Sequence, residues 1–252
     1  MKTTFRKVAP VLWSEPHDPS TYGEIDLDLT EVEAAQKENP FHILSVLFKA
    51  LNEGYKAEPQ VNSQVRFLKV VPRKDFCISL MVPHQEGDLC FSTLRELEDK
   101  GILQIDIALK AELAKVRKNK GVQEFYRLFK ILNFTPRILI FIITPLLRFL
   151  LSRDYFKIPW VPRAPFGAMI VSNVGSLGFD RALLPLVSLT KASVLVSFGR
   201  VSKKPMVFEN QVRVGSSVTV GFNLDHRIMD GFHAQRFIVA FKAVFENPKK
   251  YL

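Results

Sequence analysis

The clearest pattern of apolar and polar positions lies near the end of the chain. Residues 217–224 alternate between apolar and polar side chains, which predicts a half-buried strand. The turn 225–231 follows, and residues 234–245 then place large apolar side chains at helical spacing. Asn247 and Pro248 end that predicted helix, because proline cannot continue it. This part of the chain is therefore predicted to fold as a strand, a turn and a helix.

The same reasoning predicts strands and helices in alternation along the rest of the chain. The further predicted strands are 22–30, 65–71, 76–82, 168–172, 193–198 and 211–214. The further predicted helices begin at Thr30 and span 40–55, 94–97 and 102–116. The runs 65–71 and 76–82 are expected to pair around a turn at 72–75. No Gly/Ser-rich linker or internal repeat divides the chain, so we expect one α/β domain over residues 1–252, with an insertion at about 118–165.

Composition narrows the class of protein. The chain has 252 residues, of which 47% are hydrophobic and 24% are charged, and this excludes a disordered tail, a fibrous repeat and a disulfide scaffold. Cys77 and Cys90 lie thirteen positions apart without a CxxC pattern, and the histidines are scattered, so neither a disulfide framework nor a metal site is expected. The first residues lack the apolar core of a signal peptide, which predicts a cytoplasmic protein.

One apolar run requires a test for membrane spanning. Ile138–Leu147 is ten residues long, is bounded by Arg137 and Arg148, and contains Pro145. A spanning helix needs about 20 apolar residues, so this run is not expected to cross a bilayer. A buried core helix, an interfacial helix and a docking surface all remain open for it.

The turn at 225–231 carries the candidate chemistry. His226 and Asp230 lie four positions apart, and Gly231 follows them. A general base needs an imidazole held in one orientation, and a nearby carboxylate can fix that orientation directly or by holding the loop. A histidine at a strand end is also common as a purely structural residue, so the residues alone leave both readings open. Asp225 and Arg227 flank the histidine and can form an ion pair.

Two segments, and more diffusely three others, resemble the catalytic domain of the 2-oxoacid dehydrogenase acyltransferases, the E2 components. Leu224–Gly231 (LDHRIMDG) resembles that family's signature, and its HxxxDG core is also similar to chloramphenicol acetyltransferase. Ile170–Gly178 (IVSNVGSLG) resembles the strand and loop that face the histidine in the family. More diffusely, residues 22–30, the turn Glu58–Asn62 and the run 76–83 are similar to the family's opening elements. The resemblance covers most of 20–117 and 164–252.

The resemblance implies a fold and a mechanism. The fold would be the coenzyme A-dependent acyltransferase fold, an α+β sandwich with a mixed sheet flanked by helices. His226 would be the general base, and Ser172 would donate a hydrogen bond to the oxyanion of the tetrahedral intermediate, with no acyl-enzyme. Asp230 would be a structural carboxylate that pairs with an arginine, for which Arg6 is a candidate. The resemblance also implies a homotrimer, in which the site lies between subunits, with His226 from one chain and Ser172 from its neighbour.

The resemblance also implies substrates, and it leaves two other functions open. Coenzyme A or its acyl thioester would be a substrate, the acceptor would be an unidentified thiol, hydroxyl or amine, and no metal is implied. The chain is expected to be a stand-alone member without lipoyl or subunit-binding domains, and hence without an attached lipoyl group. Two alternatives stay open: a non-catalytic trimeric E2-like scaffold or membrane-surface protein, and an O-acetyltransferase similar to chloramphenicol acetyltransferase.

The net charge of +10 is concentrated in one stretch. Residues 110–157 hold eleven Lys and Arg against three acidic residues, so their local net charge is 11 − 3 = +8. Aromatic and aliphatic residues interleave with these bases, which is typical of an interfacial helix on anionic lipid. Residues 118–157 could thus make peripheral membrane contact, or could form a subunit contact or a lid that meets coenzyme A phosphates. No motif for nucleic-acid binding accompanies the charge.

Overall fold

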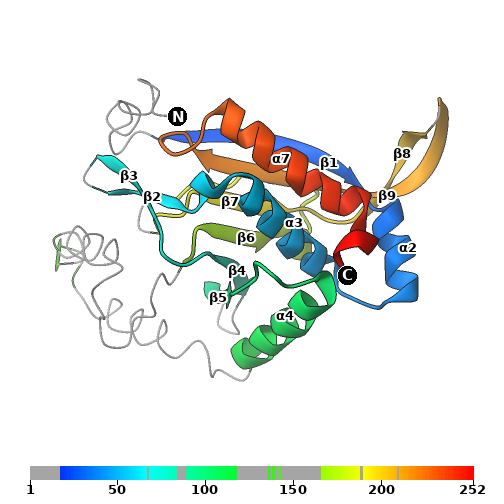
Figure 1. Ribbon diagram of the computed structural model, residues 1–252, viewed down its shortest axis with the longest axis horizontal. Helices are drawn as coiled ribbons and strands as arrows, with labels where there is room; N and C mark the ends of the chain where they lie inside the picture. The colour runs from blue at the N-terminus through cyan, green and yellow to red at the C-terminus, as the bar shows by residue number, and fades with distance from the viewer. Residues whose placement is uncertain are drawn as a thin grey trace.

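The computed structural model describes residues 18–66, 68–83, 89–117, 136, 138–139, 142, 166–187, 190–208 and 210–252 (Figure 1). In chain order the elements are β1 (Ser20–Asp28), α2 (Thr30–Glu38), α3 (Ile43–Ala57), η1 (Pro59–Val61), β2 (Ser63–Arg66), β3 (Lys69–Pro72), β4 (Cys77–Pro83), β5 (Leu89–Arg95), α4 (Ile102–Arg117), β6 (Met169–Asn173), η2 (Val174–Leu177), β7 (Val194–Phe198), β8 (Ser202–Phe208), β9 (Gln211–Asp225), α7 (Gly231–Glu246) and η3 (Pro248–Tyr251).

One mixed sheet organises these elements. Its strand order is β1-β9-β7-β6-β4-β5, and β8 pairs with β9 off this path. The pairs β4–β6 and β6–β7 are parallel, whereas β1, β5 and β8 pair antiparallel with their neighbours, as do β7 and β9. The predicted mixed sheet flanked by helices is therefore confirmed. A separate hairpin of β2 and β3 lies beside it.

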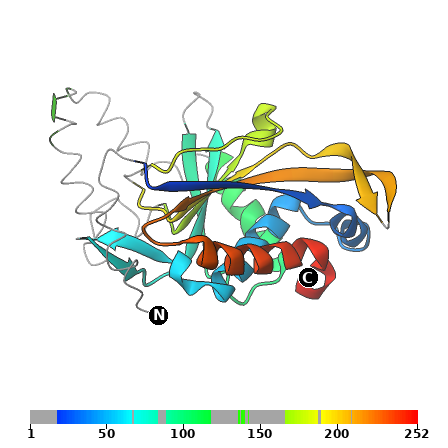
Figure 2. The ribbon, with the colours of Figure 1, turned by 90° about the horizontal axis from the view of Figure 1, so that it is seen from above.

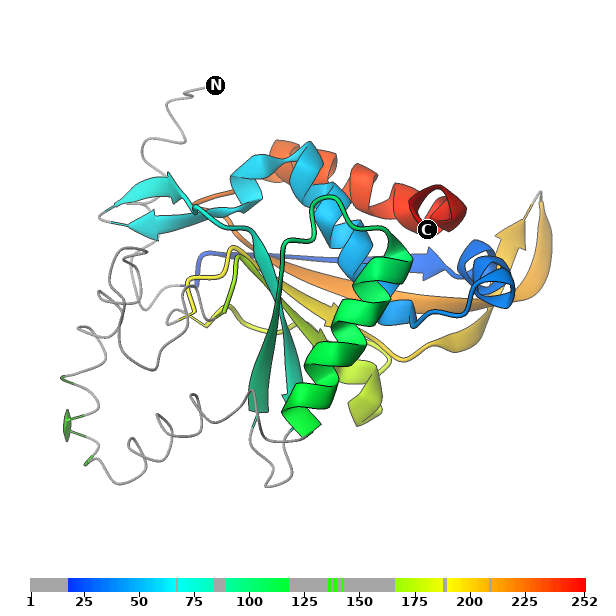
Figure 3. The ribbon, with the colours of Figure 1, turned by 60° about the horizontal axis from the view of Figure 1, so that its bottom comes forward.

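Helices α3 and α7 cover one face of the sheet, and α4 lies beside α3 (Figures 1 and 3). Their apolar stripes bury large side chains, including Phe48 of α3 and Phe241 of α7, against the sheet. Phe222 of β9 meets Phe241 edge to face, with ring centroids 5.1 Å apart. A Cβ at Gly54 would lie 2.5 Å from the ring of Phe237, so the close approach of α3 and α7 depends on that glycine.

A buried carboxylate joins α4 to the start of α3. Asp106 accepts hydrogen bonds from the His42 backbone N–H and the Ser45 hydroxyl, each at 2.8 Å, and forms an ion pair with Lys110 at 2.5 Å. Burial by itself would raise the pKa of Asp106, but these hydrogen bonds and the lysine charge outweigh it and hold the pKa below its ordinary value. Asp106 therefore stabilises the first turn of α3 from a neighbouring helix.

The connection between β6 and β7 covers the other face of the sheet. Figure 2 shows η2 on the side opposite α7. From Gly178 the chain runs across that face, and the Ser197 hydroxyl of β7 donates to the Ala182 carbonyl. Asn223 of β9 donates to the Leu184 carbonyl at 2.7 Å. Residues 178–187 take the place that a crossover helix usually fills between parallel strands.

Two sequence predictions about strands and helices are wrong. Residues 65–71 do not pair with 76–82, because β2 and β3 form their own hairpin around Leu68, and β4 pairs with β5 and β6 in the main sheet. Leu68 takes a left-handed φ of 60° without the glycine or asparagine that usually signals such a turn. Residues 94–97 are not a helix, because β5 continues to Arg95 and pairs Leu94 with Ile78.

Most of the predicted insertion at 118–165, including most of the apolar run at 138–147, lies outside the described residues. Among the residues that are described, no helix combines the length and the apolar character needed to cross a bilayer. Within the same residues, no cluster of three or more histidine, cysteine and acidic side chains is arranged to hold a metal ion.

Candidate active site

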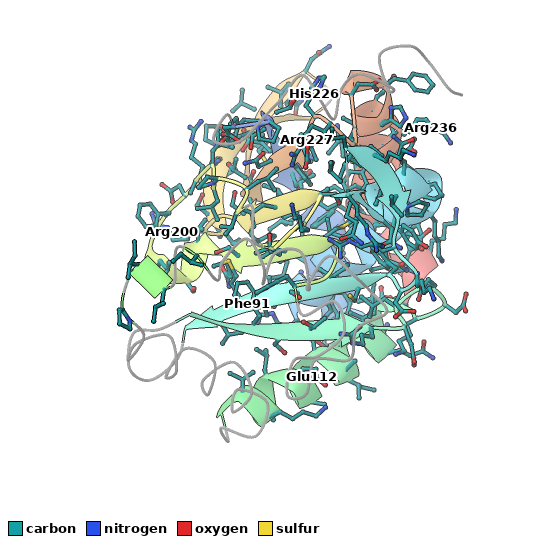
Figure 4. The ribbon with its side chains drawn as sticks, turned by 90° about the vertical axis from the view of Figure 1, so that its left-hand side faces the viewer. Phe91, Glu112, Arg200, His226, Arg227 and Arg236 are labelled. Atoms are coloured by element: carbon teal, nitrogen blue, oxygen red, sulfur yellow. The ribbon has the colours of Figure 1, made fainter. Side chains whose placement is uncertain are left out.

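His226 lies in the loop between β9 and α7. Its backbone N–H donates to the Pro19 carbonyl at 2.8 Å, just ahead of β1. The Asp225 carbonyl accepts from the backbone N–H groups of Ile228 and Met229, at 2.8 and 3.0 Å, which closes the turn. The side chains of Ile228 and Met229 are both 1% exposed, so the turn is anchored in the core while His226 stays half-buried. Figure 4 shows His226 and Arg227 together at one edge of the molecule.

The residues on either side of His226 form a buried ion pair. Arg227 donates from Nε and Nη2 to the two oxygens of Asp225, at 2.9 and 2.8 Å, and its backbone N–H also donates to Asp225 at 3.0 Å. The two side chains are only 14% and 6% exposed. A two-point contact of this kind fixes the orientation of both groups, and the histidine between them shares the restricted backbone.

Asp230 forms the N-cap of α7. Its Oδ1 accepts from the backbone N–H groups of Phe232 and His233, at 3.1 and 3.2 Å, which satisfies two otherwise unpaired donors of the first helical turn. The same oxygen lies 2.5 Å from Nδ1 of His233. The carboxylate thus fixes the end of the loop that begins at His226. Arg6, the expected arginine partner, lies outside the described residues.

Ser172 is the next-to-last residue of β6 and lies beside a tightly built turn. The Asn173 side chain accepts from the Ser176 N–H at 3.2 Å, and the Ser176 hydroxyl returns a bond to the Asn173 carbonyl at 2.7 Å. A Cβ at Gly175 would lie 2.5 Å from the Gly199 carbonyl oxygen, so this turn packs directly on the backbone after β7. Ser172 is half-buried and lies directly before this turn.

Ser172 and His226 do not come together within one subunit. Ser172 pairs with Ser197 of β7, and Ser197 pairs with Gly221 of β9. Since β9 runs antiparallel to β7, the end of β9 that leads to His226 lies at the opposite end of the sheet from Ser172. His226 is 226 − 221 = 5 residues beyond Gly221, which is roughly 16 Å along the strand. The intervening β7 adds a sideways separation of about 9.5 Å.

The part of the chain that contains Ser172 and His226 is similar to a known protein family. Residues 166–252 match the family model described as 2-oxoacid dehydrogenases acyltransferase (catalytic domain). Residues 166–252 are therefore similar to the catalytic domain of this acyltransferase family. The match contains Ser172, His226 and Asp230.

The similarity to acyltransferases extends beyond residues 166–252. The chain is 22% identical over 245 residues to the lipoamide acyltransferase component of the branched-chain alpha-keto acid dehydrogenase complex of Bacillus subtilis. That alignment covers 93% of this chain and 48% of the relative. The chain thus spans about half the length of the curated relatives that it matches over most of its own length.

Solved structures of acyltransferases share the fold. The dihydrolipoamide acetyltransferase of Azotobacter vinelandii superimposes with a TM-score of 0.65 at 17% identity, covering 93% of this chain and 84% of that one. That structure comes from an investigation of the roles of a serine, a histidine and an asparagine in its catalytic mechanism. Chloramphenicol acetyltransferase gives a TM-score of 0.53 at 11% identity and covers 97% and 96% of the two chains. The expected coenzyme A-dependent acyltransferase fold is therefore confirmed.

One contact to the loop that holds His226 was not predicted from the sequence. The side chain of Gln60, in η1, donates from Nε2 to the Ile228 carbonyl at 2.6 Å, across a sequence separation of 168 residues. Gln60 lies in the turn Glu58–Asn62 that resembles the family, but nothing in the local sequence indicates which residue this amide would reach. Such a contact becomes visible only once η1 and the loop are placed together.

Proposed function

We propose that this protein is an acyltransferase that moves an acyl group between a coenzyme A thioester and a thiol, hydroxyl or amine acceptor. The placement of His226 carries the proposal: a half-buried imidazole lies in a loop fixed by a buried ion pair on one side and a helix cap on the other. A general base needs such restraint, because its contribution depends on orientation as well as on pKa.

In the proposed reaction the His226 imidazole takes the proton from the attacking group. The acceptor then forms a bond to the thioester carbonyl carbon, and the carbonyl oxygen becomes an oxyanion. The Ser172 hydroxyl donates a hydrogen bond to that oxyanion, a contact whose loss typically costs on the order of 100- to 1,000-fold in rate. Collapse of the intermediate breaks the carbon–sulfur bond, and the departing thiolate receives the proton from the imidazolium. The acyl group is not attached to the enzyme at any stage.

We further propose that each site forms between two subunits of a trimer, with His226 from one and Ser172 from the next. The separation of the two residues along one sheet supports this arrangement, because a single subunit would have to bridge roughly 16 Å along its strands. A contact that joins one end of a subunit to the opposite end of the next is heterologous, and such contacts form a ring when the rotation between subunits closes, as it does in a trimer.

The exposed apolar surface of the β8–β9 hairpin supports self-association. This hairpin projects from the body of the molecule (Figures 1 and 2). Val207 pairs with Val212, and Val214 lies two residues further on the same face; the three are 73%, 72% and 75% exposed. A strip of apolar side chains on a projecting hairpin is typical of a surface that another chain covers.

The assay that tests the proposed function follows acyl transfer from acetyl-coenzyme A to free dihydrolipoamide. We expect His226→Ala to reduce the rate by about 100- to 10,000-fold without a change in oligomeric state, since it removes only the base. His233→Ala serves as a comparison, because that imidazole contacts Asp230 at the start of α7. An unchanged rate in His226→Ala would contradict the proposed role of the histidine.

A further inference from the structure

The structure connects the centre of the His226 loop to a distant turn through one side chain. Gln60 donates from Nε2 to the Ile228 carbonyl at 2.6 Å. Ile228 lies midway between His226 and Asp230, two residues from each. A change in the position of this carbonyl must therefore be taken up by the few backbone dihedrals on either side of it.

The turn that carries Gln60 is itself held in place. The Ser193 hydroxyl donates to the Val61 carbonyl, the residue after Gln60, while the Ser193 carbonyl accepts from the Asp225 N–H at 2.9 Å. One residue, directly ahead of β7, thus contacts both the turn and the start of the loop. The separation that the Gln60 amide spans is therefore set by the fold, rather than by the glutamine alone.

A second contact ties the same turn to the helix that follows the loop. Arg236 of α7 donates to the Ala57 carbonyl at 2.9 Å and lies 3.8 Å from the buried carboxylate of Glu58. In Figure 4, Arg236 lies on the same upper part of the molecule as His226 and Arg227. The loop of His226 is consequently bounded at both ends by elements that contact the Gln60 turn.

We infer that Gln60 is a positioning residue for the acyl transfer: its amide fixes the Ile228 carbonyl and so sets the orientation in which the loop presents His226. The inference rests on the proposed function, because it assumes that His226 is the base. Gln60 acts through the loop backbone, so its loss should affect the rate of the chemical step more than the binding of substrate.

The test replaces Gln60 by leucine, which is comparable in size but lacks the donor. With acetyl-coenzyme A and dihydrolipoamide as substrates, we expect kcat to fall by about tenfold to 100-fold, while KM for acetyl-coenzyme A changes by less than about threefold. Gln60→Glu is the second variant. It keeps the shape of the side chain and supplies only acceptors at neutral pH, so it should lower kcat in the same way even if the leucine variant folds poorly.

Gln36→Leu is the matched control. Gln36 also donates its side-chain amide to a backbone carbonyl, that of Phe41 at 2.8 Å, but the contact lies between α2 and α3 and away from the loop. We expect this variant to keep the wild-type kcat. Equal kcat values in wild type and both Gln60 variants would overturn the inference.

A readout that does not depend on activity separates this inference from the proposed function. The NMR signals of the His226 ring, assigned in isotope-labelled protein by their loss in His226→Ala, should shift or broaden in Gln60→Leu and stay unchanged in Gln36→Leu. Unchanged His226 signals in Gln60→Leu would overturn the positioning role. Full activity of His226→Ala together with shifted signals would instead contradict the proposed function and leave the contact between turn and loop established.

Discussion

Ser172 and His226 lie at opposite ends of one β-sheet, separated along the strands by roughly 16 Å and across them by the width of β7. The register that separates them is continuous through Ser197 and Gly221, both of which lie in the buried interior of the sheet. No local rearrangement of a loop can bring the two side chains together, because that would require slipping paired strands. A reaction that uses both residues at one site would therefore take them from two subunits, as we propose.

Gly199, on whose backbone the turn after Ser172 packs, gives a prediction about stability. A Cβ at Gly199 would lie 2.0 Å from the Asp180 carbonyl oxygen, a backbone atom that cannot move away independently. We expect Gly199→Ala to destabilise the protein by about 2 kcal/mol or more, measured by denaturant unfolding. Gly23→Ala is the control, because nothing lies within 4 Å of a Cβ at that position. Equal stability of the two variants would contradict the close packing at Gly199.

The cap at Asp230 gives a second prediction. Removing the carboxylate with Asp230→Ala leaves the N–H groups of Phe232 and His233 without this acceptor, and should cost about 0.5–2 kcal/mol in unfolding free energy. Asp230→Asn retains a capping oxygen and should stay within a few tenths of a kcal/mol of wild type. Thermal unfolding of the three proteins checks this, and an alanine variant as stable as wild type would argue against the cap.

Asp106 predicts a specific pH dependence. Its pKa is lowered in the folded protein from the ordinary value of 3.8, because the hydrogen bonds and Lys110 outweigh the effect of burial. A carboxyl whose pKa is lowered by folding stabilises the fold above its unfolded pKa, and that contribution is lost as the pH falls through the folded pKa. We therefore expect wild type to lose stability below about pH 4 more steeply than Asp106→Asn does. Parallel stability curves for the two proteins between neutral pH and pH 3 would contradict this.

The hairpin of β8 and β9 predicts an effect on assembly. If the strip formed by Val207, Val212 and Val214 is covered by another chain, a charge on it should weaken association. We expect Val212→Glu to shift the protein from trimer to monomer in light scattering, with loss of transfer activity. Val239→Glu is the control, because Val239 is 63% exposed on α7, away from the hairpin. A trimer that persists in Val212→Glu would show that the strip is not part of the interface.

The strands and helices with strong periodicity could be predicted from the sequence. The strand at 169–173, the strand at 194–198 and the helix at 231–246 lie where the apolar pattern placed them. The hairpin of β2 and β3 could not be predicted, since Leu68 takes its left-handed backbone conformation without the residue type that usually announces it. Strand β8 was missed because Ser202–Phe208 includes two lysines and a proline, and it gains its place from pairing with β9.

The candidate site divides in the same way. His226, Asp230 and Ser172 could be named because they lie in segments whose local sequence resembles a family. The cap formed by Asp230 follows from its position just before an apolar helix. The contact of Gln60 with Ile228 depends on elements 168 residues apart, and no local pattern encodes such a distance.

Subunit mixing tests the central claim most directly. Ser172→Ala and His226→Ala, each nearly inactive alone, are co-expressed with different tags, and the mixed trimers are assayed with acetyl-coenzyme A and dihydrolipoamide. If each site takes His226 from one subunit and Ser172 from the next, every mixed trimer contains one intact site of its three, and activity should recover to about a third of wild type. Mixed trimers that stay as inactive as the separate variants would contradict a site shared between subunits.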